Sequence, residues 1–141
     1  MKKTTLYIYI AAAFILISMI SCTRNHGDIG PWFGTWHVES ITADGTPVSF
    51  TVDYFFQFQS RVFRVSQVKA HEQLVESFGT WQNDEVAQMT ITFPDPTVFY
   101  IEMPGLEVHN QFAVSVSSKR AVFTKTDKSG ITYTYSLKKQ P

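Results

Sequence analysis

Residues 50–59 read FTVDYFFQFQ, and this alternation of apolar and polar side chains is the strongest indication of fold in the chain. A period of two places alternate side chains on opposite faces of a β-strand. The face expected to be buried carries Phe50, Val52, Tyr54, Phe56 and Phe58. Burial on one face only is typical of antiparallel sheets, so the stretch predicts a half-buried antiparallel strand.

The same alternation recurs between short turn signals through the rest of the chain. It predicts strands over about 34–42, 47–59, 61–70, 73–82, 86–93, 97–103, 107–117, 120–126 and 131–138. No apolar stripe of helical period follows Ile20. Since closing a sheet removes its exposed edges, we expect an all-β fold, a single antiparallel up-and-down β-barrel of about eight strands over residues 32–141.

The chain begins with a basic pair, Lys2 and Lys3, followed by an apolar run over residues 6–20 and by Cys22. Fifteen helical residues rise only about 22 Å, short of the ~30 Å hydrocarbon core, which argues against a stable span. The pattern is typical of a secretory signal. Met19-Ile20-Ser21-Cys22 resembles a bacterial lipobox, in which the cysteine is acylated, with palmitate among the chains it receives, and becomes the new N-terminus.

This reading divides the chain into a lipoprotein signal peptide (1–21), the lipidated Cys22 with a polar tether (22–31) and the barrel (32–141). A cleaved secretory protein and an uncleaved anchor are the alternatives. The expected location is the cell envelope, with acyl chains on Cys22 holding the protein in the outer membrane. The segment directly after Cys22 contains one acid and one base, Arg24 and Asp28, which favours the periplasmic face over the cell surface.

Composition excludes several classes of function. The chain has 12 basic and 12 acidic residues and no block of like charge, so it offers no footprint for nucleic acid. Cys22 is the only cysteine, which excludes disulfides, a redox motif and a thiolate metal site. No Gly-rich phosphate loop and no hydrolase motif is present, so we expect neither an enzyme nor a cofactor.

A short repeat marks two strands: Gly34-Thr35-Trp36 recurs as Gly79-Thr80-Trp81. Glycine permits a close backbone approach or a bulge, and tryptophan fills apolar volume while its N–H finds a carbonyl. The motif therefore predicts two tryptophans that fill a barrel end, although two unrelated core residues would look the same.

These features resemble the lipocalin-like domains of bacterial lipoproteins, with a Gly-x-Trp strand, an Asp-Gly turn at Asp44-Gly45 and a final hairpin that ends in basic residues. The similarity spans roughly Trp32 to Lys139 and implies a calycin-like barrel. Lipocalins also set a late arginine over the first-strand tryptophan, which implies a cation–π contact of Arg120 with Trp36. The chain lacks the Thr-Asp-Tyr triplet, the disulfide and the C-terminal helix of true lipocalins.

Such a barrel either fills its interior or holds one small ligand. The first hypothesis is non-catalytic binding of a small apolar or amphipathic ligand. The side chains expected to line its pocket are Trp36, Tyr54, Phe56, Phe78, Met89, Phe112, Tyr133 and Tyr135. The alternative is a solid barrel that acts as a protein–protein interaction or inhibitor module in the cell envelope.

Three surface features bear on that alternative. Phe55 interrupts the alternation and would form an outward apolar patch together with Val62, Val68 and Val98. The loops at 94–97 and at Pro104-Gly105 are stiff and suited to displaying a docking surface. His37, Glu39 and His109 could converge on a metal, but their spacing matches no metal motif, so no metal site is expected.

Overall fold

The structure, a computed structural model, describes residues 3–5, 7–9, 30–85, 87–94 and 101–141. The chain divides into two compact units, Met1–Gly30 and Pro31–Pro141. In the first, residues 3–5 and 7–9 are helical. None of the helical residues described belongs to a helix long and apolar enough to cross a membrane. Cys22 and the expected cleavage site lie outside the described residues.

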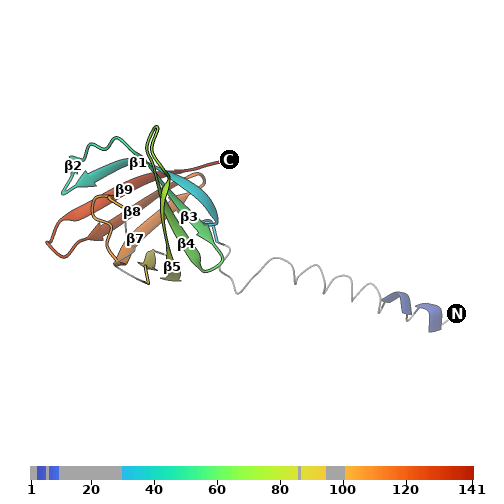
Figure 1. Cartoon of the computed structure of the whole chain (residues 1–141). Coiled ribbons are helices and arrows are strands. Elements are labelled where there is room, and N and C mark those ends of the chain that lie inside the picture. Colours follow the sequence, from blue (N-terminus) through green and yellow to red (C-terminus); the bar gives the residue numbers. More distant parts are fainter. Residues whose placement is uncertain (1–2, 6, 10–29, 86, 95–100) are drawn as a thin grey trace. The chain divides into compact units, whose positions relative to one another are not determined.

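The second unit is an antiparallel β-sheet that closes on itself (Figure 1). Its described strands are β1 (Gly34–Ala43), β2 (Thr46–Pro47), β3 (Asp53–Gln59), β4 (Val62–Val68), β5 (Val75–Glu85), β6 (Gln88–Thr92), β7 (His109–Ser117), β8 (Arg120–Thr126) and β9 (Thr132–Lys139). Neighbours in sequence pair in order from β3 to β9, and β1 pairs with both β3 and β9. The predicted closed, up-and-down, eight-stranded barrel is confirmed, with β2 as a two-residue addition to β1.

Local sequence explains how the first hairpin forms. Asp44 and Gly45 both have positive φ, of 48° and 82°. This is the geometry of a type I′ turn, whose twist matches that of the flanking strands. The Asp44 carboxylate then accepts a hydrogen bond of 2.9 Å from the backbone N–H of Thr132, which ties the turn to β9.

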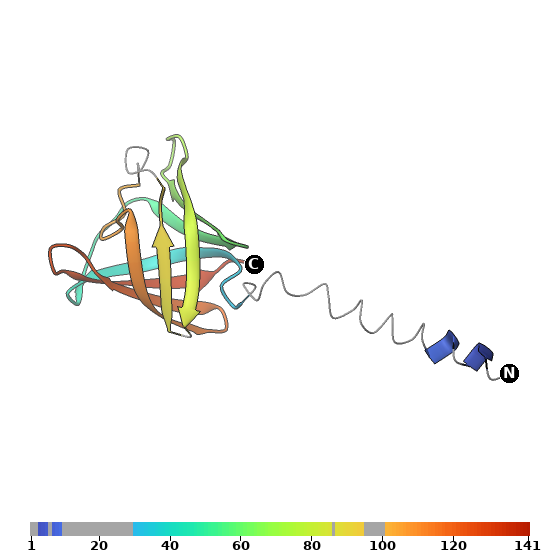
Figure 2. The ribbon, with the colours of Figure 1, turned by 90° about the horizontal axis from the view of Figure 1, so that it is seen from below.

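The core of the barrel is built from the inward positions of the alternating strands. In β3, Tyr54, Phe56 and Phe58 are buried, as the sequence pattern predicts, while the residues between them are half-buried. Burying each such ring stabilises the fold by roughly 1.5–3 kcal/mol. Figure 2 gives a second view of the barrel, with β5, β6 and β7 side by side.

Two predicted strands are wrong in part. Residues 48–52 of the expected strand 47–59 are not in a sheet, and β3 begins only at Asp53. Residues 101–103 of the expected strand 97–103 are not in a sheet, and residues 97–100 lie outside the described part. The alternation is real, since Ile101 and Met103 are buried. It arises because these side chains pack on the barrel core from a non-strand segment that precedes β7.

Candidate functional site

Aromatic rings fill the centre of the barrel. Phe56, Phe58 and Phe123 are at most 1 % exposed. The ring centroid of Phe123 lies 5.8 Å from that of Phe56 and 6.1 Å from that of Phe58. Phe63 packs edge-on against Phe56 at 5.2 Å, and Phe112 packs against Phe123 at 5.3 Å. Such tilted and edge-to-face pairs are favourable beyond the area they bury.

Most of the residues expected to line a pocket belong to this packed core. Fully or nearly fully buried are Trp36, Tyr54, Phe56, Met89, Phe112 and Tyr135. Tyr133 is half-buried and stacks on Tyr135 at 6.4 Å. Tyr135 packs against the rings of Phe56 and Phe112. Phe112 also borders the groove described below.

The prediction for Phe78 is wrong. Its side chain is 55 % exposed on the outer face of β5, opposite Arg64 of β4. Trp81 points into the barrel, so the period of two places Gly79 and Ser77 inward and Phe78 outward. Counting back along the strand from Trp81 of the Gly-Thr-Trp repeat, with a period of two, would have predicted that Phe78 faces outward.

The repeat itself marks close contacts at two places in the wall. The Trp36 N–H donates a hydrogen bond of 2.8 Å to the carbonyl of Trp32. A Cβ on Gly79 would lie 2.4 Å from the carbonyl oxygen of Thr92, so glycine is required for β5 and β6 to approach this closely. Trp81 is also buried, but among the described residues its N–H has no hydrogen-bond partner.

The expected contact of Arg120 with Trp36 is not formed. Lys139 takes that place, with its Nζ 5.4 Å from the Trp36 ring centroid. A side chain at Gly34, where φ is +115°, would press against Lys139. Arg120 instead pairs with Glu39 across the sheet at 2.5 Å.

A groove opens in the barrel wall where β7 and β8 separate. Their pairing ends at Ala113 and Thr124, although β7 begins at His109 and β8 continues to Thr126. The groove has a volume of about 780 Å³. Side chains of three adjacent strands and of the segment before β7 line it, namely Gln88, Thr90, Thr92, Glu107, His109, Asn110, Gln111, Phe112, Ala113, Thr124, Lys125 and Thr126.

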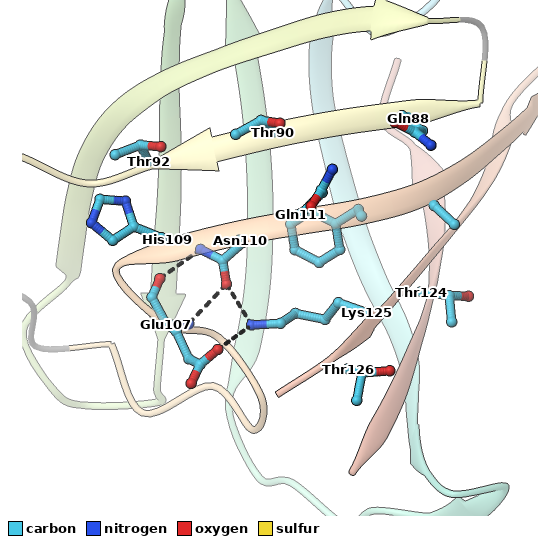
Figure 3. Close-up of a pocket in the computed structure, with 12 residues that line it drawn as sticks. Gln88, Thr90, Thr92, Glu107, His109, Asn110, Gln111, Thr124, Lys125 and Thr126 are labelled. Atoms are coloured by element: carbon cyan, nitrogen blue, oxygen red, sulfur yellow. Dashed lines mark hydrogen bonds and ion pairs between the residues drawn. The ribbon is translucent and has the colours of Figure 1, made fainter. Parts of the chain in front are cut away.

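The lining of this groove is mainly amide and hydroxyl, as Figure 3 shows. Gln88, His109 and Gln111 border it from exposed, outward positions, whereas Asn110 and Phe112 of β7 are buried. Phe112 and Ala113 supply its apolar contacts. A surface of this kind offers both hydrogen-bond donors and acceptors together with an apolar area of similar size.

Lys125 crosses the gap between the two strands. Its side chain is only 2 % exposed, and its Nζ lies 3.0 Å from Glu107 Oε2 and 2.8 Å from Asn110 Oδ1 (Figure 3). It also donates to the carbonyl of Gly105 at 2.6 Å. A buried ammonium is tolerated only when its charge is paired and its hydrogens are bonded, and the three acceptors meet both requirements.

Asn110 completes this cluster from β7. Its amide oxygen also accepts from the backbone N–H of Glu107 at 2.9 Å, and its amide nitrogen donates to the Glu107 carbonyl. Glu107, Asn110 and Lys125 were not among the residues expected to form a site. A usable signal was present, because Ala121, Phe123 and Lys125 share the inward face of β8 and a lysine there requires a buried anion.

The segment from Ile101 to Val108 folds over the end of the barrel next to the groove. Met103 to Leu106 forms a turn, with the Leu106 N–H donating to the Met103 carbonyl at 3.2 Å and φ of +78° at Gly105. Proline followed by glycine at a positive φ is typical of a type II turn. The turn does not display a docking surface as predicted, since Met103 and Leu106 are buried against the core.

Tyrosine hydroxyls lie beneath this segment. Tyr135 donates a hydrogen bond of 2.6 Å to the Pro104 carbonyl, and burial raises the pKa of its phenol. Burial, and then the negative charge of Glu102, also raises the pKa of Tyr54. Both phenols are therefore neutral donors well above neutral pH.

His37, Glu39 and His109, the residues considered for metal binding, do not converge on one site. His37 Nε2 pairs with Asp53 at 3.0 Å, and Glu39 pairs with Arg120. His109 borders the groove. In the described part of the chain, no group of three or more His, Cys, Asp or Glu side chains is placed to hold a metal ion.

Only part of the patch that was expected around Phe55 can be traced in the described residues. Phe55 is half-buried, with its ring 5.0 Å from the ring of His37. Val62 and Val68 are exposed at 48 % and 39 %. Val98 lies outside the described residues.

No protein-family model matches this chain, and no curated protein matches it. Two solved structures share its architecture. A lipocalin-like protein from Bacteroides uniformis superposes with a TM-score of 0.61 at 20 % identity, covering 79 % of this chain and 100 % of the other. A protein from Bacteroides eggerthii gives a TM-score of 0.55 at 15 % identity, covering 77 % of this chain and 99 % of the other. Residues 31–141 therefore have the lipocalin-like fold, a closed antiparallel barrel of eight strands.

Proposed function

We propose that the protein binds one small amphipathic ligand, without catalysis, in the groove between β6, β7 and β8. The observation that carries this proposal is the convergence of polar side chains from three strands around a groove of about 780 Å³. Ligand sites are commonly 300–1,000 Å³ in volume, and the groove lies within this range. The rings packed in the barrel centre favour the groove over the interior as the site.

The lining favours a ligand with a neutral, hydrogen-bonding head. Thr90, Thr92 and Gln111 offer donors and acceptors without net charge. Lys125 and Glu107 neutralise each other at 3.0 Å, so the groove presents no unpaired charge of theirs to an ion. The Phe112 ring and Ala113 can cover a short apolar part.

The direct test blocks the groove. Gln111→Trp puts a bulky ring on an exposed position within the lining, and Ser115→Trp puts the same ring on the same outer face of β7 outside it. Native mass spectrometry of protein purified from its own membranes should show a small guest on the wild type and on Ser115→Trp, and at least tenfold less on Gln111→Trp. Equal guest occupancy in all three proteins would exclude the groove as the site.

The proposal also includes export and lipid anchoring through Cys22. Its support is the basic start, the apolar run and the lipobox-like Met19-Ile20-Ser21-Cys22. Cys22→Ala should abolish incorporation of an alkynyl palmitate label and release the protein from the membrane fraction, whereas Ser21→Ala should retain both. Labelling of Cys22→Ala at the wild-type level would contradict acylation at this residue. The periplasmic face of the outer membrane is the location we propose.

A second function is favoured by one surface of the barrel. Phe78 and Val62 are 55 % and 48 % exposed and border a shallow cleft with Gln57, Gln59 and Arg64. An envelope protein could dock there, as expected of a solid barrel. A photo-reactive phenylalanine at position 78 should then form a cross-linked product in cells that the same group at Val122, exposed on β8, does not form.

A further inference from the structure

Three lysines lie at the end of the barrel opposite to the segment from Ile101 to Val108. Lys119 is in the turn that follows β7, and Lys138 and Lys139 lie at the end of β9. They border a hollow of about 580 Å³, which is lined by Ser118, Lys119, Lys138, Lys139, Gln140 and Pro141. Among the described residues, no Asp or Glu side chain lines it, and a carboxylate at Pro141 would offset only one of the three charges. The hollow is therefore suited to anions.

Two of these lysines have no counter-ion in the part of the chain that the structure describes. Lys119 and Lys138 are both exposed and form no ion pair there. Lys138 lies directly opposite Arg120 in the ladder of β8 and β9, but Arg120 already pairs with Glu39 at 2.5 Å. The ammonium groups of Lys119 and Lys138 are thus available to an anion from outside the barrel.

An exposed aromatic ring accompanies the lysines. Phe33 is 46 % exposed and stands between Pro31 and Gly34, both of which contact Lys139. The Lys139 Nζ donates a hydrogen bond of 3.2 Å to the Pro31 carbonyl, and a Cβ on Gly34 would lie 3.3 Å from Lys139 Cε. A surface that combines lysines with an exposed apolar ring has the composition that binds anionic lipid interfaces.

This end of the barrel is also where the chain enters it. The barrel unit begins at Pro31, and β1 starts beside the end of β9, where Trp36 pairs with Lys139 (Figure 2). Residues 22–30 span at most about 30 Å when fully extended. An acylated Cys22 would therefore keep Pro31 within that distance of a bilayer. Tethering makes the second contact intramolecular, so weak individual interactions suffice to hold it.

We propose that Lys119, Lys138, Lys139 and Phe33, here named the lysine patch, dock the barrel on the surface of a membrane that contains anionic phospholipid. The ammonium groups of Lys119 and Lys138 pair with headgroup phosphates, and the ring of Phe33 enters the interface. Each lysine near an anionic surface strengthens binding by roughly fivefold, and salt screens the attraction. The inference rests on the lipid anchoring under Proposed function and is independent of the groove.

The rate of lysine acetylation tests the docking residue by residue. The full chain is placed in bicelles of phosphatidylcholine, with or without one third phosphatidylglycerol, which its apolar run at 6–20 should enter whether or not Cys22 is acylated. A water-soluble N-hydroxysuccinimide ester then labels the amines, and peptide mass spectrometry gives each rate. Phosphatidylglycerol should slow the labelling of Lys119 and Lys138 at least threefold. Lys128, exposed beyond the opposite end of β8, is the internal control and should not change.

Variants test whether the patch acts as a unit. The indole N–H resonance of Trp36 reports on it, because Lys139 Nζ lies 5.4 Å from the ring centroid. Phosphatidylglycerol should shift this resonance equally in the wild type and in Lys128→Gln. The shift should fall at least threefold in the double variant Lys119→Gln/Lys138→Gln, in which only exposed residues are changed. Phe33→Gln should at least halve the protection of Lys119 and Lys138.

Three results would overturn the proposal. The first is equal slowing at Lys128, Lys119 and Lys138, which would mean general attraction to the bicelle without a patch. The second is a labelling rate that phosphatidylglycerol does not change. The third is the same protection by inorganic phosphate in phosphatidylcholine bicelles at equal ionic strength, which would make the hollow a site for a free anion. None of these results bears on acylation of Cys22 or on the groove, because neither enters the test.

Discussion

The phenol of Tyr135 donates a hydrogen bond of 2.6 Å to the carbonyl of Pro104, which joins the inward face of β9 to the segment that covers the barrel end. The phenol is shielded from water, since Tyr135 is 0 % exposed. The hydrogen bond exists only while the phenol keeps its proton, and burial raises the pKa of that group. The closed barrel end is therefore sensitive to alkaline pH.

Stability should fall as the pH rises above about 10. The unfolded-state phenol ionises near its ordinary pKa of 10.0, whereas the folded-state phenol of Tyr135 stays protonated, so the unfolded state gains a charge that the folded state cannot. One such group changes the free energy of unfolding by about 1.4 kcal/mol per pH unit in this range. Urea unfolding between pH 9 and 11.5 should show a smaller loss in Tyr135→Phe than in the wild type. Parallel curves for the two proteins would argue against this role of Tyr135.

Gly79 should tolerate no side chain. An added Cβ would lie 2.4 Å from the carbonyl oxygen of Thr92, which belongs to the backbone and cannot rotate away. Overpacking of this kind typically costs about 1–3 kcal/mol, so Gly79→Ala should lower the free energy of unfolding by that amount. Thr80→Ala, at the exposed next position, is the control and should change stability by less than ~0.5 kcal/mol.

Lys139 rather than Arg120 should influence the environment of Trp36. Lys139→Met removes the cation that lies 5.4 Å from the Trp36 ring centroid, while Arg120→Met removes only an exposed partner of Glu39. The indole N–H resonance of Trp36 in a ¹H–¹⁵N spectrum should shift in Lys139→Met and stay in place in Arg120→Met. A shift caused by Arg120→Met alone would restore the expectation from the family resemblance.

Asp127 should stabilise the hairpin between β8 and β9 only in its ionised form. Its carboxylate accepts hydrogen bonds of 2.7–2.9 Å from the Ser129 hydroxyl and from the backbone N–H groups of Ser129 and Ile131. The hydrogen bond from the Ser129 side chain is the main cause that lowers the pKa of Asp127 below its ordinary 3.8. Its contribution is thus present above pH 3.8 and is lost as the pH falls through the lower, folded-state value. NMR titration of the carboxyl carbon gives that value directly, and a midpoint at or above 3.8 would contradict the prediction.

The fold could be predicted because it depends on local alternation. Apart from Phe55, strand β3 alternates apolar and polar side chains, so its buried face follows from the sequence, and the Asp44-Gly45 turn fixes the register of the first hairpin. The segment around Met103 could not be predicted in the same way. Its alternation is that of a strand, but its position depends on contacts with Tyr133 and Tyr135, which are distant in sequence.

The groove could not be predicted from the sequence, for a related reason. It exists because β7 and β8 stop pairing at Ala113 and Thr124, and alternation does not reveal where a ladder ends. The expectation of a ligand inside the barrel rested on the resemblance to lipocalin-like domains and on the inward positions of the expected lining residues. The structure packs those rings against each other, and the polar cluster of Lys125, Glu107 and Asn110 lies at the wall instead.

The central claim is that the groove between β6, β7 and β8 holds a small ligand. The most direct measurement is a crystal structure of the protein purified from its own membranes, without added ligand. The account predicts non-protein density in contact with Thr90, Gln111 and Phe112, and none there in crystals of Gln111→Trp. The account would be contradicted if the groove of the wild type held only ordered water. Mass spectrometry would then show either no guest or a guest that is bound elsewhere.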